Sequence, residues 1–232
     1  MYIPVPDVEK EDWQKLVDSL IKQEILKTPR VIKAMRAVPR SKFLPVDMQG
    51  YNAVDTPLPI GFGQTISAPH MVSIMNEALE LKVGCKVLEV GAGSGWHAAT
   101  VAEIVAPSGA PRSEWGHVFT VEIVQGLAEN ARKNIMNMGY GDRITIINGD
   151  GSKGYAEKAP YERIVVTAAA PSVPKPLVEQ LKSEGIVVIP VGSASMFQKL
   201  LKITKQADGK IREENLGGVA FVPLTGEHGH KF

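Results

Sequence analysis

Cysteine is almost absent from this sequence of 232 residues, in which Cys85 is the one example. A single cysteine cannot form an intramolecular disulfide and leaves too few thiolates for a cysteine-rich metal site, so no bound metal is expected. The sequence lacks any run near the roughly 18 apolar residues of a membrane-spanning helix, and the N-terminus lacks the apolar core of a secretory signal. A formal net charge of +1 gives no global electrostatic case for binding nucleic acid. We therefore expect a cytoplasmic protein without membrane or nucleic-acid partners.

The first part of the chain is predicted to be helical and then irregular. Residues 8–27 carry apolar side chains at helical spacing. Thr28 and Pro29 are typical of the start of a second helix, with Thr28 as its cap, and this helix should end near Val38. Residues 44–68 form a long, turn-rich segment, and a loop of this length in a compact domain is more often functional than idle.

Strands and helices alternate in the rest of the chain. Helices are predicted from about residue 69, over 95–105 and over 124–135. The predicted strands are residues 87–90, 117–122, 143–148, 163–168, 185–191, 199–205 and 217–224. Asp208 and Gly209 signal a turn between the last two strands. This alternation indicates a mostly parallel sheet covered on both faces, with an antiparallel hairpin closing one edge.

A glycine-rich turn follows the first strand of this pattern. Residues 89–96 read EVGAGSGW, with glycines at 91, 93 and 95. Glycines let a strand turn sharply into a helix and let a ligand approach the backbone closely. A dinucleotide fingerprint requires its third glycine where this chain has Trp96, so a nicotinamide-dependent oxidoreductase is disfavoured. The G-x-G-x-G spacing is typical of methyltransferases that use S-adenosylmethionine, and a purely structural turn is the alternative.

Two carboxylates follow the next two strands. Glu122 ends one strand, where an acid can accept hydrogen bonds from both hydroxyls of a ribose; a solvated strand end is the alternative. Asp150 precedes Gly151 after the following strand, where it could accept from an adenine amino group or simply form a turn. Three such features at successive strand ends are more specific than any one of them, and together they predict a site for S-adenosylmethionine.

Four segments make the sequence more particular. They are PLPIGFGQTISAPHM (57–71), GDGSKGY (149–155), VVTAAAP (165–171) and FVPLTG (221–226). Together they resemble the protein-L-isoaspartate O-methyltransferase family, from about residue 10 to residue 226. The resemblance implies methyl transfer from S-adenosylmethionine, which leaves S-adenosylhomocysteine, to the free carboxylate of isoaspartyl residues in damaged proteins. The methyl ester collapses to a succinimide that can reopen to normal aspartate, so the implied function is protein repair.

The resemblance also implies roles for individual residues. Ser67 matches the active-site serine. The positions matching cofactor contacts are Gly91, Gly93, Ser94, Gly95, Glu122, Ile123, Asp150, Gly151 and Thr225. The positions expected near the substrate are Asp55, Gln64, Thr65, Ile66, His70, Ala169, Ala170 and Pro171. Asp55 and His70 also have plainer interpretations, as a solvated loop acid and a half-exposed residue at a helix start.

Ser67 has two possible roles. The nucleophile would be a carboxylate with a reference pKa near 4, which is ionised at pH 7, so no general base is needed. Ser67 is then an orienting hydroxyl rather than a covalent nucleophile. Its position before the helix also suits an N-cap, and one hydroxyl can serve both roles.

The sequence departs from the family in three places. Val72 stands where some relatives carry a second histidine, Glu89 stands where aspartate is frequent, and the connection 108–116 is longer than usual. Rival functions are a nucleobase N-methyltransferase, which usually has an Asn/Asp-Pro-Pro-aromatic motif absent here, a small-molecule carboxyl methyltransferase, and a non-catalytic binding module.

The expected architecture is an α/β fold with the Rossmann-like sheet of class I S-adenosylmethionine methyltransferases. It has a helical N-terminal extension and a C-terminal antiparallel hairpin. We expect a monomer with one domain over residues 1–232, in which residues 1–68 form the extension and the cofactor and substrate loop, and residues 69–232 form the core.

Overall fold

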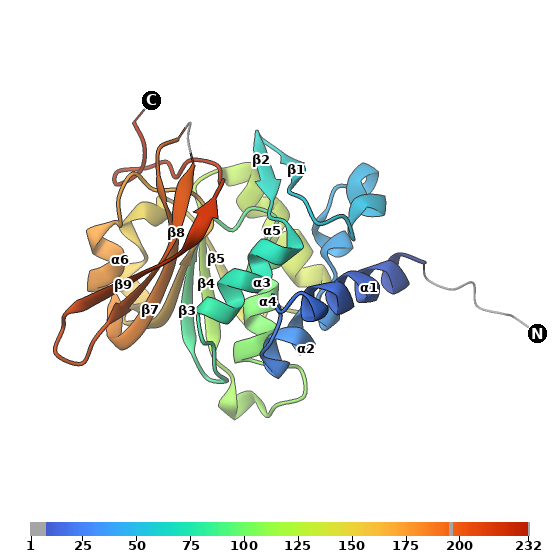
Figure 1. Cartoon of the computed structure of the whole chain (residues 1–232), viewed down its shortest axis with the longest axis horizontal. Coiled ribbons are helices and arrows are strands. Elements are labelled where there is room, and N and C mark those ends of the chain that lie inside the picture. Colours follow the sequence, from blue (N-terminus) through green and yellow to red (C-terminus); the bar gives the residue numbers. More distant parts are fainter. Residues whose placement is uncertain (1–7, 195–196, 232) are drawn as a thin grey trace, which may run out of the picture.

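A seven-stranded sheet forms the centre of the computed structural model, which describes residues 8–194 and 197–231. The strand order is β5-β4-β3-β6-β7-β8-β9, and the pairs from β5 to β7 are parallel whereas β8 and β9 are antiparallel (Figure 1). The strands are β3 (Lys86–Val90), β4 (His117–Glu122), β5 (Ile144–Asn148), β6 (Tyr161–Val166), β7 (Leu181–Gly192), β8 (Gln198–Lys205) and β9 (Ile211–Val219). The predicted Rossmann-like sheet with an antiparallel edge is confirmed.

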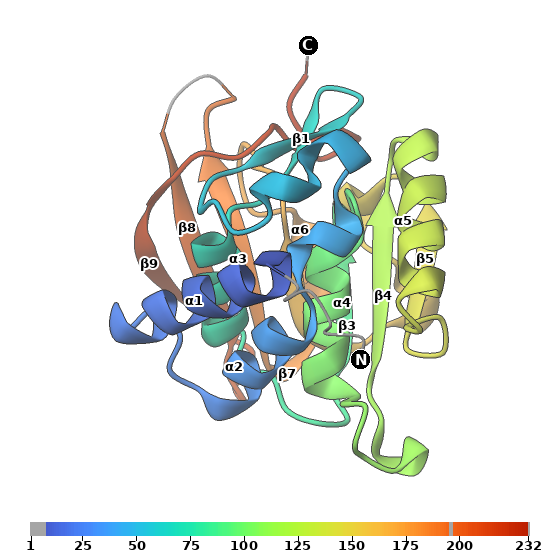
Figure 2. The same cartoon turned by 90° about the vertical axis from the view of Figure 1, so that its right-hand side faces the viewer.

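Helices cover both faces of the sheet (Figures 1 and 2). They are α1 (Val8–Lys22), α2 (Pro29–Ala37), α3 (Pro69–Ala78), α4 (Trp96–Val105), α5 (Gln125–Asn137) and α6 (Lys175–Glu179). Helices α1, α2, α3, α4 and α5 pack on one face of the sheet through one buried apolar cluster. Helix α6 packs on the other face through a second cluster. The strands alternate between these clusters: Val87 belongs to the first and Leu88 to the second, as a pleated strand buried on both sides requires.

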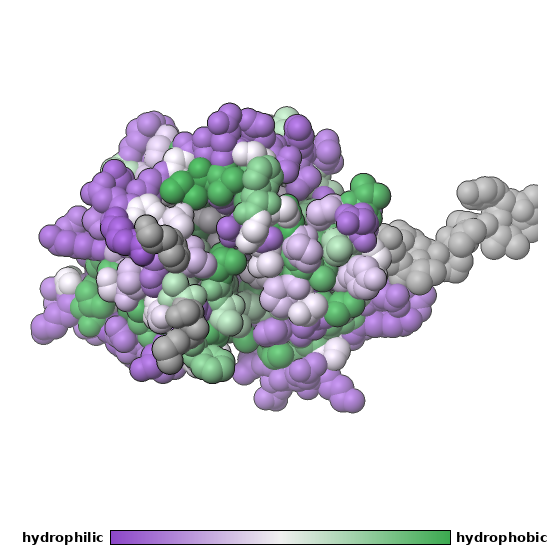
Figure 3. All heavy atoms as spheres, turned by 90° about the horizontal axis from the view of Figure 1, so that it is seen from above, coloured by the Kyte–Doolittle hydropathy of each residue, from purple (hydrophilic) through white to green (hydrophobic). Residues whose placement is uncertain are grey.

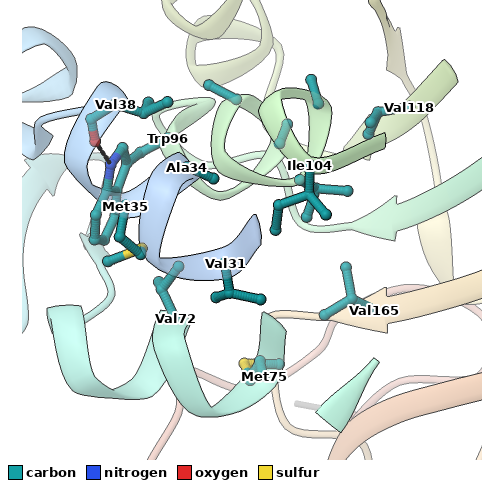
Figure 4. Packing of buried hydrophobic residues seen from close by; sticks show 14 of the residues in the cluster. Val31, Ala34, Met35, Val38, Val72, Met75, Trp96, Ile104, Val118 and Val165 are labelled. Atoms are coloured by element: carbon teal, nitrogen blue, oxygen red, sulfur yellow. Dashed lines mark hydrogen bonds between the residues drawn. The ribbon is translucent and has the colours of Figure 1, made fainter. Parts of the chain in front are cut away.

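The N-terminal helices are held to α4 by two tryptophans. Trp13 and Trp96 meet edge to face with ring centroids 5.9 Å apart. The indole of Trp13 donates to the carbonyl of Met35, and that of Trp96 donates to the carbonyl of Val38 at 3.0 Å (Figure 4). Both rings are thus buried with their N–H groups satisfied, as large amphipathic side chains in a core require.

The cap of α2 differs from the prediction. Thr28 occupies the N-cap position, but its side chain makes no cap hydrogen bond. Its hydroxyl donates instead to the carboxylate of Glu77 on α3 at 2.5 Å, and its backbone N–H bonds the same carboxylate. A charged acceptor gives a stronger hydrogen bond than a neutral one, so the threonine connects two helices rather than capping one.

The structure corrects two predictions of secondary structure. The segment expected to be a loop contains a hairpin of β1 (Leu58–Gly61) and β2 (Gln64–Ile66), preceded by the short 3-10 helices η1 (Arg40–Phe43) and η2 (Val46–Tyr51). The last strand covers Ile211–Val219 rather than 217–224. Most of β9 is exposed, so it lacks the alternation of apolar residues that marks a half-buried strand. Among the described residues, no helix is long and apolar enough to cross a membrane.

Candidate active site

A cavity opens at the carboxyl ends of β3, β4 and β6, which is where ligands bind in sheets of this type. Among the predicted site residues, those that line this first cavity are Gln64, Thr65, Ile66, Ser67, Gly91, Gly93, Ser94, Glu122, Ile123, Gly151 and Thr225. They come from the β1–β2 hairpin, the glycine turn, the ends of β4 and β5, and the C-terminal segment. The fold therefore brings together residues from five separate parts of the sequence.

The glycine turn has the backbone that its composition predicts. Gly91, Gly93 and Gly95 have φ angles of 98°, 53° and 88°, in the left-handed region that favours glycine. A Cβ atom on Gly91 would lie 2.3 Å from Oγ1 of Thr167, whose hydroxyl donates to the Gly91 carbonyl at 2.6 Å. Gly95 caps α4 and faces Ile135 rather than the cavity.

Glu122 lies at the cavity wall with 6% of its surface exposed. One carboxylate oxygen accepts from the backbone N–H of Gly93 at 2.8 Å, and the other accepts from Val124 at 3.0 Å. These bonds fix the orientation of the side chain. A carboxylate oxygen has more than one lone pair, so both oxygens can still accept from a ligand.

Asp150 does not line the cavity. One of its oxygens accepts from the backbone and hydroxyl of Ser152, and the other accepts from the backbone N–H of Glu227 at 2.8 Å. Partial burial acts to raise the pKa of Asp150, but the hydrogen bonds from Ser152 and Glu227 outweigh it and lower the pKa. The carboxylate therefore fastens the C-terminal segment, which brings Thr225 to the cavity.

A second cavity adjoins the first. Its walls come from the start of α3, from Phe197 and from residues 218–222, and Figure 3, seen from this end of the molecule, shows apolar side chains exposed among polar ones. Four residues line both cavities: Thr65, Ser67, Thr167 and Val222. The two cavities thus meet beside the hydroxyl groups of three of these side chains.

Ser67 is half-buried at this junction. The N-cap of α3 is Ala68, so the interpretation of Ser67 as the cap is wrong. The Ser67 hydroxyl makes no hydrogen bond to another residue in the part of the chain that the structure describes, whereas its carbonyl accepts from Arg40 at 3.3 Å. The hydroxyl is free to bond a ligand.

Asp55 and His70 form a pair beside this junction. One oxygen of Asp55 accepts from the backbone N–H of His70 and lies 2.9 Å from its ring nitrogen Nδ1. His70 is the second residue of α3, so Asp55 accepts from one of the backbone N–H groups that have no partner within the helix at its N-terminus. Ser67 does not take this role. His70 lines the second cavity, and Asp55 lines neither.

The predicted alanine stretch is placed less directly. Ala169 and Ala170 are fully buried and form bridges to Pro223 and Val191, whereas Pro171 is exposed. None of the three lines either cavity. The neighbouring Thr167 and Ala168 line the first cavity instead.

Arg40 is a site residue that the sequence did not reveal. It is fully buried, and burial lowers its pKa to about 10, so it stays charged at neutral pH. Its guanidinium donates to five backbone carbonyls, those of Tyr51, Asn52, Val54, Thr56 and Ser67. It therefore joins the loop before the hairpin to the residue at the cavity junction. Carbonyl partners leave no trace in a sequence.

A buried acid and histidine lie behind the glycine turn. Glu89 is fully buried, and one oxygen accepts from Thr120 at 2.5 Å. The other oxygen has no hydrogen-bond partner among the described residues and lies 3.6 Å from Nδ1 of His97. Burial, with a smaller contribution from nearby Glu122, raises the pKa of Glu89 to about 8, and burial lowers the pKa of His97 to about 4. Both side chains are therefore neutral at pH 7.

Comparisons with known proteins show which family the chain belongs to. A family match to protein-L-isoaspartate(D-aspartate) O-methyltransferase spans residues 11–229. A protein-L-isoaspartate O-methyltransferase from Hyperthermus butylicus is 52% identical over 229 residues, which cover 97% of this chain and 95% of that protein. One from Thermococcus sibiricus is 52% identical over 218 residues and covers 94% of this chain and 95% of its own.

A solved structure agrees as well. The fold is similar to a crystal structure from Plasmodium falciparum, which is described as a protein-L-isoaspartate O-methyltransferase in complex with S-adenosyl-L-homocysteine. The TM-score is 0.79 and the sequence identity is 27%. The match covers 92% of this chain and 98% of that one. The chain therefore belongs to the protein-L-isoaspartate(D-aspartate) O-methyltransferase family.

Proposed function

We propose that the protein transfers a methyl group from S-adenosylmethionine to the free carboxylate of isoaspartyl residues in proteins, which starts their repair through a succinimide. The observation that carries this proposal is the junction of the two cavities at Ser67, Thr65 and Thr167. A methyl donor in one cavity and a peptide in the other would meet there. The family membership supports both partners.

The first cavity fits the adenosyl cofactor. Gly151 lines this cavity beside Val90, and a Cβ atom on Gly151 would lie 2.7 Å from a methyl carbon of Val90, so only glycine lets the backbone pack this closely at the cavity wall. Glu122 retains lone pairs for ribose hydroxyls, and Gly91, Gly93 and Ser94 surround the remaining part. When bound, the cofactor supplies a methyl group on a positively charged sulfur. Asp150 already accepts hydrogen bonds from Ser152 and Glu227. We therefore assign it the role of holding the C-terminal segment at the cavity, rather than a role in binding adenine alone.

The residues of the junction orient the substrate. An isoaspartyl carboxylate is ionised at neutral pH, so the protein needs to align it and exclude water rather than remove a proton. Ser67, whose hydroxyl is free, donates to this carboxylate in our proposal. Alignment of reacting groups can contribute roughly 7–11 kcal/mol to lowering a barrier.

The second cavity receives the peptide in this proposal. Thr65 lines both cavities, Gln64 and Ile66 line the cofactor cavity beside it, and His70 faces the peptide while Asp55 holds its ring. Ala169, Ala170 and Pro171 act indirectly, by fixing the adjacent lining residues. The extra backbone methylene of isoaspartate shifts its carboxylate relative to the flanking peptide bonds. Normal aspartate is rejected because its carboxylate does not reach the methyl group.

A paired-peptide assay tests this function. The purified protein is mixed with methyl-labelled S-adenosylmethionine and with two peptides that differ only in isoaspartate or aspartate at one site. We expect base-labile methyl ester on the isoaspartyl peptide alone. Labelling of neither peptide, with cofactor binding intact, would reject the substrate. Competition by small carboxylic acids but not by the peptide would favour a small-molecule methyltransferase.

The wider setting is also a proposal. We infer that the protein acts as a monomer in the cytoplasm, on proteins rather than nucleic acids. The net charge of +1 gives no electrostatic case for nucleic acid, and the single cysteine fits a reducing compartment. Sedimentation of the purified protein and fractionation of cells would check the first two statements.

A further inference from the structure

The tip of the β1–β2 hairpin has an unusual backbone. Gly61, Phe62 and Gly63 have positive φ angles of 87°, 54° and 69°. The left-handed region suits glycine but is an outlier for a bulky side chain, and such a conformation persists where surrounding contacts hold it. Burial does not hold it here, because Phe62 is 60% exposed.

The ring of Phe62 lies on Gly126, the second residue of α5. A Cβ atom on Gly126 would lie 2.4 Å from Cζ of the ring and 2.8 Å from Cε1. Any side chain at position 126 would therefore displace the ring. Gly126 is not among the glycines with positive φ, and glycine is a poor helix former. The close approach of the ring explains why glycine stands there.

This contact bridges two walls of the first cavity. Residues 64–67 line one wall and follow directly after the hairpin tip, whereas Val124 and Leu127, which flank Gly126, line the other. The hairpin lies beside the start of α5 in both views (Figures 1 and 2). No hydrogen bond between described residues joins β1 or β2 to α5, so side-chain contacts hold these walls together.

We propose that Phe62 is a positioning residue that rests on Gly126, holds β2 against α5 and thereby keeps the adenosyl cofactor in its cavity. This inference rests on the proposed function and deepens it. The ring must leave Gly126 before the hairpin can move away from α5. The contact therefore slows release of the cofactor product and keeps Ser67 at the junction.

Release of labelled S-adenosylhomocysteine tests the proposal. The label is bound first and then chased with excess unlabelled S-adenosylhomocysteine, for the wild type and for Phe62→Ala, Gly126→Ala and the double variant. We expect each single variant to release the label about fivefold faster, as a partly exposed aromatic contact would allow. The double variant should be no faster than the single ones, because all three lose the same contact.

Gly126→Ala gives the most distinctive result. Alanine favours the helix, so the midpoint of thermal unfolding should equal or exceed that of the wild type while release becomes faster. A merely structural role of Gly126 would not separate these two readouts. Met136→Ala is the matched control, since it removes another exposed apolar side chain (66% exposed) from the far end of α5 and should leave release unchanged.

The outcomes separate this inference from the proposed function. Release rates of Phe62→Ala and Gly126→Ala within about twofold of the wild type, or effects that multiply in the double variant, would overturn the positioning role. A wild-type protein that retains no S-adenosylhomocysteine would overturn the proposed function itself, and this inference with it.

Discussion

Substitution of Glu89 by glutamine should change how the stability of the protein depends on pH. The pKa of this buried carboxyl is raised to about 8, from an ordinary value of 4.5. The folded protein therefore keeps a proton that the unfolded chain releases between pH 4.5 and pH 8. Stability falls as the pH rises through this window, because the folded state binds more protons. Glutamine is similar in size and does not titrate.

His97 defines where the effect is best measured. Its pKa is lowered from 6.5 to about 4, so the unfolded chain binds more protons between these values and stability rises with pH there. Below pH 6.5 the two contributions oppose each other. Between pH 6.5 and pH 8, Glu89 is the one member of the pair whose proton binding differs between the folded and unfolded states. One bound proton changes the free energy of unfolding by 1.36 kcal/mol per pH unit, so the free energy of unfolding should fall by about 2 kcal/mol over this range.

Urea unfolding at pH 6.5 and pH 8 provides the assay. The wild type should lose about 2 kcal/mol more than Glu89→Gln between the two values. All other titrating groups are common to both proteins and cancel in the difference. Glutamine can still accept from Thr120, which bonds Glu89 at 2.5 Å. An identical pH dependence in the two proteins would show that Glu89 is already ionised in the folded state, and would refute the reasoning.

Three further substitutions separate positioning from binding. Ser67→Ala should lower turnover of isoaspartyl peptide about tenfold or more and leave the dissociation constant of S-adenosylhomocysteine within about twofold, because it removes one orienting hydrogen bond; a parallel loss of cofactor affinity would contradict that role. Arg40→Lys leaves at least two of the five carbonyls without a donor, which should cost about 2–5 kcal/mol in thermal unfolding and raise KM for the peptide. Arg143, buried and bound to Glu103 away from the cavities, gives the matched control Arg143→Lys, which should lose stability without a change in KM. Asp150→Asn places an amide where an acceptor is needed, so hydrogen exchange at the backbone N–H of the C-terminal segment should accelerate about tenfold or more; unchanged exchange would show that the carboxylate does not fasten this segment.

The sequence predicted those elements whose burial leaves a periodic pattern. Strands β3 to β8 and helices α3 to α5 carry apolar residues on their covered faces, and the family resemblance is confirmed by the match over residues 11–229. The β1–β2 hairpin was missed because β2 has three residues, too few to show a period. The division of the chain at residue 68 stays a prediction.

The lining of the first cavity was largely predicted from the sequence, whereas contacts to backbone groups were missed. Glu122 and the glycine turn were expected at one site because they stand at successive strand ends, and both line the first cavity. The interactions of Arg40 were not found, because its partners are backbone carbonyls separated by up to 27 residues. Asp55 took the helix-capping role expected of Ser67 because a carboxylate from a neighbouring loop reaches the same backbone group.

The burial of Trp96 gives the protein an optical reporter of its own site. Trp96 lines the first cavity with 1% of its surface exposed, and it contacts Trp13 edge to face. The third tryptophan, Trp115, packs against Arg112 and Arg143 and lines neither cavity. We expect the emission of the buried pair to change when a ring enters the cavity, whereas the contribution of Trp115 should stay constant. Cofactor exchange can thus be followed by intrinsic fluorescence, without attaching a dye near the hairpin.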